Sequence, residues 1–324
     1  MSLVRGMVQE WAEDIKCLRL PMPAYDAVNA WILGAAKGQV VVDTGMPGPE
    51  TAALWDAARF EGLLQDLDSV LCTHAHIDHV GQVGALVAGG RVPLFMSRPE
   101  YADVVHLSGM DAPTRRRRTD DFLLEGGFSA GGALSTADYS ILAPFPGTVR
   151  FLEDGEKITL AGIEFEVLVG GGHSRAAICL FSRARKLLLS GDQILAGSGP
   201  QISVLAERAE DDTLGAYLAF LDRLDALPDD LIVLPGHSRP IHDFKAQIRR
   251  IREGHHARLA RLSQGIAGAM SAAQMVSLAF SETTARRMHA RLPYLMRALT
   301  NFLVARGRLY ASREDGTLVF SRPG

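Results

Sequence analysis

The stretch Thr73-His74-Ala75-His76-Ile77-Asp78-His79 decides how this chain is interpreted, because it gathers three imidazoles and a carboxylate within six residues. Burying four such groups together is costly unless a positive charge lies between them. A divalent metal ion is the simplest such charge, since imidazole and carboxylate are ligands for zinc, iron and manganese. The alternative is a solvated polar loop with incidental histidines, and the ligand candidates elsewhere in the chain disfavour it.

The residues on either side predict a strand that ends at this stretch and a helix that leaves it. Ser69–Cys72 is apolar and short, as in a buried strand, and Val80–Val87 has helical spacing. In extended backbone His74 and His76 point the same way. Asp78 and His79 follow where the chain bends, so they can face a second ion. Two ions about 3.5–4 Å apart can share one hydroxide, and coordination to a metal lowers the pKa of water toward about 7.

Three later segments place a ligand candidate directly after a predicted strand. These segments are Gly170-Gly171-Gly172-His173, Ser190-Gly191-Asp192 and Pro235-Gly236-His237. A glycine beside each candidate lets the backbone turn sharply and brings the side chain inward. The triple glycine matches neither a dinucleotide-binding fingerprint nor a phosphate loop, so we interpret it as a tight turn that places His173.

With these motifs in this order, residues 15–243 resemble the metallo-β-lactamase superfamily. The signature His-x-His-x-Asp-His is present as His74–His79. The resemblance implies an α/β (α+β) fold, a four-layer αββα sandwich, with a two-metal site at one edge. It also implies ligand roles: His74, His76 and His173 for the first metal, Asp78, His79 and His237 for the second, and Asp192 between them. Zinc is the expected metal, with iron and manganese as alternatives.

Asp43 in Val42-Asp43-Thr44-Gly45 matches an acidic position of the family close to the metals. One interpretation is that its carboxylate orients a ligand imidazole. The other is that it simply forms a turn, and the two stay open at this point.

The chain of 324 residues, 47% hydrophobic and 22% charged, can form one large domain or two. We expect a catalytic domain over 1–244, with an irregular insertion or lid at 97–147. Residues 245–324 hold 14 Lys or Arg against 4 Asp or Glu, a balance of +10. Helical spacing followed by a hairpin around Glu314-Asp315-Gly316 predicts a winged-helix-like domain there.

Other signals are weaker. Gly127–Gly131 matches Gly-x-Ser-x-Gly, but that motif requires a strand before it and a helix after it. Arg175, two residues after a predicted ligand, is a candidate for binding a substrate anion, with a surface salt bridge as the alternative. Arg115–Arg118 could contact substrate phosphates or form a solvated face. His255 and His256 match no ligand motif.

The superfamily includes many hydrolases, so the fold alone does not name a substrate. The pair Asp78-His79 fits the thioesterase, lactonase and nuclease branches, whereas common zinc β-lactamases carry Cys at the position of Asp192. We therefore expect hydrolysis of a small thioester, ester or lactone, with Asp78 accepting or orienting the proton of water. The alternative is an endoribonuclease, which the basic C-terminal residues favour.

Location and assembly are also expectations. Residues 1–14 have no hydrophobic leader pattern, no run of about 18 apolar residues occurs, and three scattered cysteines suit a reducing compartment. We expect a cytoplasmic enzyme with a small-molecule substrate and no membrane contact. A homodimer is expected if the C-terminal helices expose an apolar face.

Overall fold

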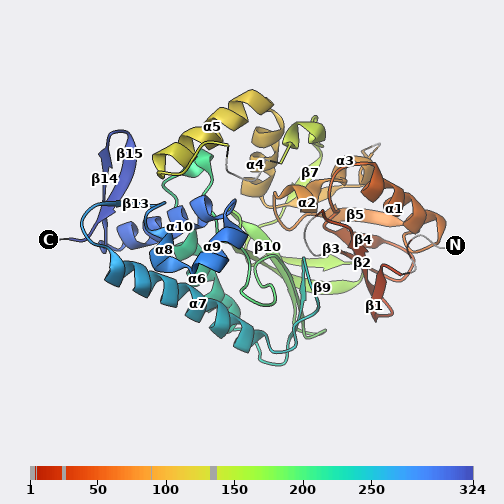
Figure 1. Ribbon diagram of the computed structural model, residues 1–324. Helices are drawn as coiled ribbons and strands as arrows, with labels where there is room; N and C mark the ends of the chain where they lie inside the picture. The colour runs from red at the N-terminus through yellow and green to blue at the C-terminus, as the bar shows by residue number, and fades with distance from the viewer. Residues whose placement is uncertain (1–3, 5, 24–26, 89, 132–136, 324) are drawn as a thin grey trace.

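The structure is a computed structural model that describes residues 4, 6–23, 27–88, 90–131 and 137–323. Two mixed β-sheets form the centre, and helices cover their outer sides (Figure 1). Three hydrophobic clusters fill the spaces between these layers: one between the sheets and one beneath the helices on either side. The predicted four-layer αββα sandwich is confirmed.

The first sheet has seven strands in sequence order, antiparallel from β1 to β4 and parallel from β4 to β7. Its strands are β1 (Val8–Ala12), β2 (Ile15–Leu20), β3 (Val28–Leu33), β4 (Gln39–Val42), β5 (Leu67–Leu71), β6 (Leu94–Met96) and β7 (Val149–Phe151). The second sheet has the order β12-β11-β10-β9-β8. Its strands are β8 (Lys157–Leu160), β9 (Ile163–Gly170), β10 (Ala177–Ser182), β11 (Leu187–Gly191) and β12 (Ile232–Pro235).

Strand β3 shows why these segments form a sandwich. All six of its residues are buried, so the strand is covered on both faces. Ala30 and Ile32 pack beneath the helices, whereas Trp31 and Leu33 pack against the second sheet. Successive side chains of a strand point to opposite faces, so a continuous apolar run serves two cores at once.

The helices of the first half cover the first sheet. They are α1 (Pro49–Phe60), α2 (Ile77–Val80), α3 (Val83–Leu86) and α4 (Arg98–Ser108). The single helix expected over Val80–Val87 is divided into α2 and α3, and α2 begins within the histidine-rich stretch.

Residues 97–147 are more helical than expected. They contain α4, α5 (Ala112–Glu125) and the short 3-10 helix η1 (Tyr139–Leu142). Ser97 and Asp111 accept hydrogen bonds at the N-termini of α4 and α5, and each helix has a proline in its first turn. Prolines at such positions start helices rather than break them. Residues 132–136 of the expected lid lie outside the described residues.

The C-terminal residues form α7 (Phe244–Gly265), β13 (Met270–Ser271), α8 (Val276–Ala279), α9 (Glu282–Met288), α10 (Leu292–Ala305) and the hairpin of β14 (Tyr310–Glu314) and β15 (Thr317–Ser321). Buried side chains of α7, α10 and β15 belong to the same cluster as those of α6 (Thr213–Asp225) on the second sheet. The winged-helix-like character and the division near residue 245 stay predictions.

Helix α10 is buried over Leu292–Leu303, so its apolar side chains are covered within the chain. The predicted homodimer gains no support from this helix and stays a prediction. Among the described residues, no helix is both long and apolar enough to traverse a bilayer.

Candidate metal centre

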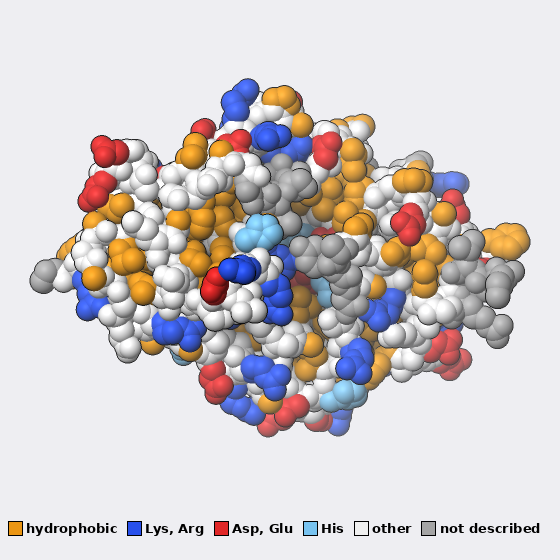
Figure 2. Space-filling view, in the orientation of Figure 1, with side chains coloured by type: hydrophobic (Ala, Val, Ile, Leu, Met, Phe, Trp, Pro, Cys, Tyr) orange, Lys and Arg blue, Asp and Glu red, His pale blue; other side chains and the backbone are white. Residues whose placement is uncertain are grey.

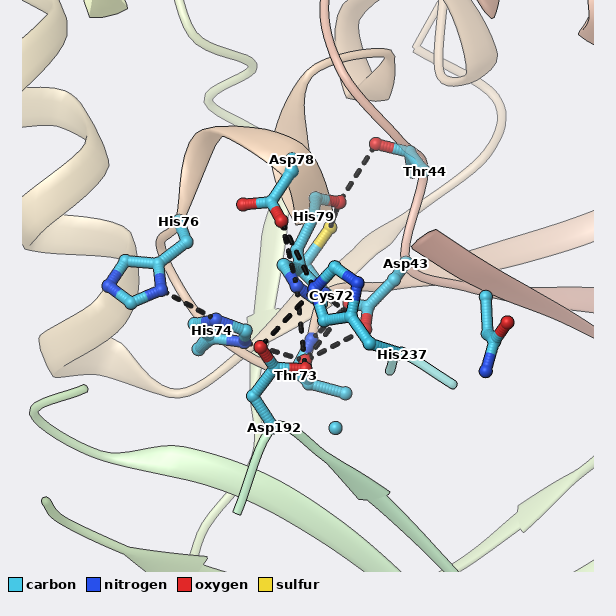
Figure 3. A network of polar contacts seen from close by, with 12 residues as sticks. Asp43, Thr44, Cys72, Thr73, His74, His76, Asp78, His79, Asp192 and His237 are labelled. Carbon is cyan, nitrogen blue, oxygen red and sulfur yellow. Dashed lines mark hydrogen bonds and ion pairs between the residues drawn. The ribbon is translucent and has the colours of Figure 1, made fainter. Parts of the chain in front are cut away.

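The predicted ligand residues come together in groups of neighbouring side chains, and all of them except His173 are labelled in Figure 3. The loop after β5 carries His74 and His76, and α2 carries Asp78 and His79. The remaining three follow β9, β11 and β12. Three overlapping groups have ligand atoms within 4.8 Å of one another: His74, His76 and His173; His74, His79 and Asp192; Asp78, His79 and His237.

The two predicted ligand triads form adjoining clusters, with the ring centroids of His74 and His79 4.1 Å apart where they meet. In the first, Nε2 of His74 lies 3.0 Å from Nδ1 of His76, and the ring of His173 packs against both. In the second, Oδ2 of Asp78 lies 3.6 Å from Nε2 of His79 and 3.2 Å from Nε2 of His237.

Asp192 lies between the two clusters. Its Oδ2 is 3.4 Å from Nε2 of both His173 and His237, and its Oδ1 is 3.7 Å from Nε2 of His79. One carboxylate thus faces a histidine of the first triad and two of the second, which is the position that a bridging ligand requires.

Hydrogen bonds on the outer side of the rings leave the inner nitrogens available. Nδ1 of His173 donates to the carbonyl of Gln201 at 2.9 Å, and Nδ1 of His237 donates to the carbonyl of Ala27 at 3.1 Å. A neutral imidazole that donates through Nδ1 presents the lone pair of Nε2, which is the form that binds a metal.

Three buried polar atoms of the centre have no hydrogen-bond partner among the described residues. They are Nε2 of His79, Nε2 of His173 and Oδ1 of Asp192. Buried polar atoms are nearly always paired, so such a set calls for a partner that is not part of the chain. Imidazole nitrogens and a carboxylate oxygen are a donor set that suits divalent cations.

Asp43 combines both roles that its sequence allowed. Its φ of 63° places it in the left-handed region, where Asp is tolerated in turns. Its Oδ1 accepts the backbone N–H of Thr73 at 2.8 Å, and its Oδ2 lies 2.8 Å from Nδ1 of His79. The turn therefore brings a carboxylate under the imidazole of a predicted ligand.

Burial and neighbouring polar groups shift the pKa values of the residues in the centre. Burial raises the pKa of Asp78, but the nearby His79 and His237 outweigh it and hold this pKa at about 2. Burial lowers the pKa of His237, but its hydrogen bonds to Asp192 and Asp78 raise it to about 10. Burial lowers the pKa of His76 to about 3. Burial also lowers the pKa of His79, but the nearby carboxylates of Asp43 and Asp78 outweigh it and raise this pKa.

Two further residues of the site were missed from sequence. Glu100 on α4 is fully buried and accepts the backbone N–H of Ala75 at 2.8 Å. Tyr139 on η1 donates its hydroxyl proton to the carbonyl of the same residue at 3.1 Å. The spacing Ser97-x-x-Glu100 is a helix-start pattern that could have located α4, but no local pattern indicates what either side chain contacts.

A pocket opens beside the first cluster. His76, Tyr139, His173, Arg175, Leu205 and Arg208 are among the residues that line it. Arg175 is half-exposed there and lies 3.4 Å from Asp103, so the salt bridge of the second interpretation is present. Because Arg175 also lines the pocket, its binding of a substrate anion stays a prediction. Arg208 holds Asp103 more closely, with two hydrogen bonds of 2.8 and 2.7 Å.

The competing sequence signals do not form sites. Ser129 of the Gly-x-Ser-x-Gly match follows helix α5 rather than a strand, so the nucleophile elbow is absent there. Arg115 points inward and pairs with Asp138, while Arg116 is exposed beside Asp120. His255 is buried on α7 beside the ring of Tyr217 and belongs to none of the metal-ligand groups found among the described residues.

Comparisons with known proteins agree with this geometry. The chain is 28% identical over 222 residues to the human acyl-coenzyme A thioesterase MBLAC2, covering 64% of this chain and 72% of that protein. A β-lactamase domain protein from Burkholderia ambifaria superposes with a TM-score of 0.83 at 28% identity, covering 98% and 95% of the two chains. A metallo-β-lactamase family protein from Thermus thermophilus superposes with a TM-score of 0.80 at 23% identity, covering 97% and 100%.

The model of the metallo-beta-lactamase superfamily matches residues 24–237, which include every predicted ligand. The chain therefore belongs to the metallo-beta-lactamase superfamily of metal-dependent hydrolases.

Proposed function

We propose that this chain is a binuclear metal-dependent hydrolase of small thioester, ester or lactone substrates. The observation that carries the proposal is the position of Asp192 between two triads of ligand-type side chains. In this proposal His74, His76 and His173 hold one cation, Asp78, His79 and His237 hold the other, and Asp192 contacts both. Zinc is the first choice of metal, followed by iron and manganese.

Bound cations would supply Lewis acidity, which polarises a carbonyl oxygen and lowers the pKa of water. The chain contributes the arrangement around them. Asp78 is ionised at neutral pH and lies at the centre, so its carboxylate can accept or orient the proton of an attacking water. The pocket beside His76 and His173 receives the substrate, and Arg175 at its rim can bind an anionic group.

The likeness to an acyl-coenzyme A thioesterase supports a thioester as the substrate to test first. The endoribonuclease alternative rested on the basic C-terminal residues. On the face drawn in Figure 2, Lys and Arg side chains are mixed with Asp and Glu and form no continuous basic surface. Helix α10 is also buried, so it does not offer a side to a nucleic acid. We therefore keep hydrolysis of a small substrate as the proposal.

The test measures thiol release from a panel of acyl-coenzyme A and acyl-glutathione thioesters. Lactone opening is measured in parallel through the acid that it produces. Protein loaded with zinc, iron or manganese is compared with the chelated protein and with the Asp78→Asn variant. We expect metal-dependent turnover that this variant loses. Inactivity on the whole panel, or metal-dependent cleavage of single-stranded RNA at low salt without thioester or lactone turnover, would overturn the proposal.

A further inference from the structure

We propose that Glu100 and Tyr139 are positioning residues that hold Ala75, the residue between His74 and His76, from both sides. The inference rests on the proposed ligand roles of these two histidines. It gives residues 97–147 a different task from that of a lid: they fix the loop that presents two ligands.

The backbone of Ala75 is held entirely by side chains from this segment. Its N–H donates to Oε2 of Glu100 at 2.8 Å, and its carbonyl accepts the hydroxyl of Tyr139 at 3.1 Å. Glu100 is 0% and Tyr139 is 9% exposed, so water competes little for these bonds. Ala75 lies beyond the end of β5 in a loop, where no strand ladder fixes the backbone.

The same glutamate also holds the segment that carries His173. Its second oxygen, Oε1, accepts the backbone N–H of Ala176, and the hydroxyl of Ser97 donates to the carbonyl of Ala176 at 2.8 Å. Both oxygens of Glu100 therefore accept from backbone donors in two ligand-bearing loops. A glutamine at this position would turn its NH2 group toward one of these donors, so an ionised carboxylate is the group that fits.

Helix α5 supports the tyrosine. Nη2 of Arg115 donates to Oδ1 of Asp138 at 2.8 Å, and Asp138 in turn accepts the backbone N–H of Ser140 at 3.1 Å. Asp138 caps η1, the turn that carries Tyr139. The buried first arginine of the Arg115–Arg118 run thus secures the turn from which Tyr139 reaches Ala75.

The test measures metal binding directly and needs no substrate. Cobalt(II) is titrated into the metal-free wild-type protein and into Tyr139→Phe, which removes one oxygen and no packing carbon. Affinity is measured by competition with a chelator, and ligand geometry by the visible absorption bands of cobalt. We expect cobalt affinity about tenfold weaker in Tyr139→Phe, the lower limit for partners that orient ligands, and altered absorption bands.

Glu100→Gln, with the exposed Glu50→Gln as its control, should show a larger loss of affinity. Tyr310→Phe, which alters an exposed tyrosine, is the control for Tyr139→Phe. Both controls should match the wild type. Wild-type affinity and bands in Tyr139→Phe would overturn the positioning role while leaving the proposed function standing. Failure of the wild-type protein to bind cobalt would overturn both.

Discussion

The carboxylate of Asp43 and the imidazole of His79 form a fully buried hydrogen bond, with Oδ2 and Nδ1 2.8 Å apart. Asp43 also accepts the hydroxyl of Thr73, whose oxygen lies 2.9 Å from Nδ1 of His74. Because the hydroxyl proton is used toward the carboxylate, Thr73 accepts from His74. One carboxylate therefore sets the tautomer of two predicted ligands, one in each triad, and leaves Nε2 of both rings facing the centre.

Replacing Asp43 by Asn should weaken metal binding while preserving the turn, because Asn also tolerates a positive φ. The new NH2 group would meet Nδ1–H of His79 and favour the wrong tautomer, with the proton on Nε2. We expect metal affinity to fall about 10–100-fold, measured by chelator competition. The control is Asp66→Asn, which alters an exposed carboxylate that accepts the backbone N–H of Gly38 at 3.0 Å. Unchanged affinity would mean that Asp43 serves only as a turn residue.

Asp78→Asn should lower turnover about 10²–10⁴-fold, the range found when a positioned acid or base is lost. The side chain keeps its shape but loses the charge that faces His79 and His237. The measurement is kcat on the best substrate of the panel, with bound metal determined on the same sample. Wild-type kcat at full metal content would contradict the assigned role of Asp78.

Many of the side chains that meet at the candidate site could be named from the sequence because they belong to short local motifs. His74, His76, Asp78 and His79 lie within six residues, and the other three each follow a strand and a glycine. The short apolar run Ser69–Cys72 likewise indicated a strand, and helical spacing indicated helices in the C-terminal residues.

The contacts that hold the site could not be predicted, because their partners are distant in sequence. Glu100 meets a backbone N–H 25 residues away, and Tyr139 meets a carbonyl 64 residues away. Nothing in the sequence distinguishes Arg115 from the three arginines that follow it, but in α5 Arg115 is buried and the other three are exposed. Local patterns report which face of an element is buried, but not which loop lies against that face.

Metal uptake should release protons at neutral pH. In the metal-free protein the pKa of His237 is raised to about 10, because hydrogen bonds to Asp192 and Asp78 outweigh burial. This imidazole is therefore protonated at pH 7 and must lose its proton to bind a cation. We expect metal affinity to rise as the pH is increased toward the pKa of His237. Calorimetry in buffers with different ionisation enthalpies counts the protons, and a count of zero at pH 7 would contradict the assignment of His237.

Glu125→Ala should destabilise the whole chain. Arg297 on α10 is 1% exposed and pairs with Glu125 on α5 at 3.3 Å, so the variant leaves a buried charge without its partner. We expect the free energy of unfolding to fall by about 3 kcal/mol. Glu282→Ala breaks the exposed pair with Arg286 and should cost less than about 0.5 kcal/mol. Denaturant midpoints measure both variants, and a similar small loss for both would show that the buried pair contributes nothing.

Gly236→Ala should weaken metal binding at the centre without unfolding the chain. A Cβ at this position would lie 2.3 Å from Oδ1 of Asp192 and 2.9 Å from Cε1 of His79, so one of these side chains must move. We expect metal affinity at least about tenfold weaker, as for other displaced ligands, with the melting temperature of the metal-free protein little changed. Gly84→Ala on α3, where a Cβ meets nothing within 4 Å, is the control and should bind metal normally. Full metal binding by Gly236→Ala would show that Asp192 is free to move without cost, and would contradict its position as the shared ligand.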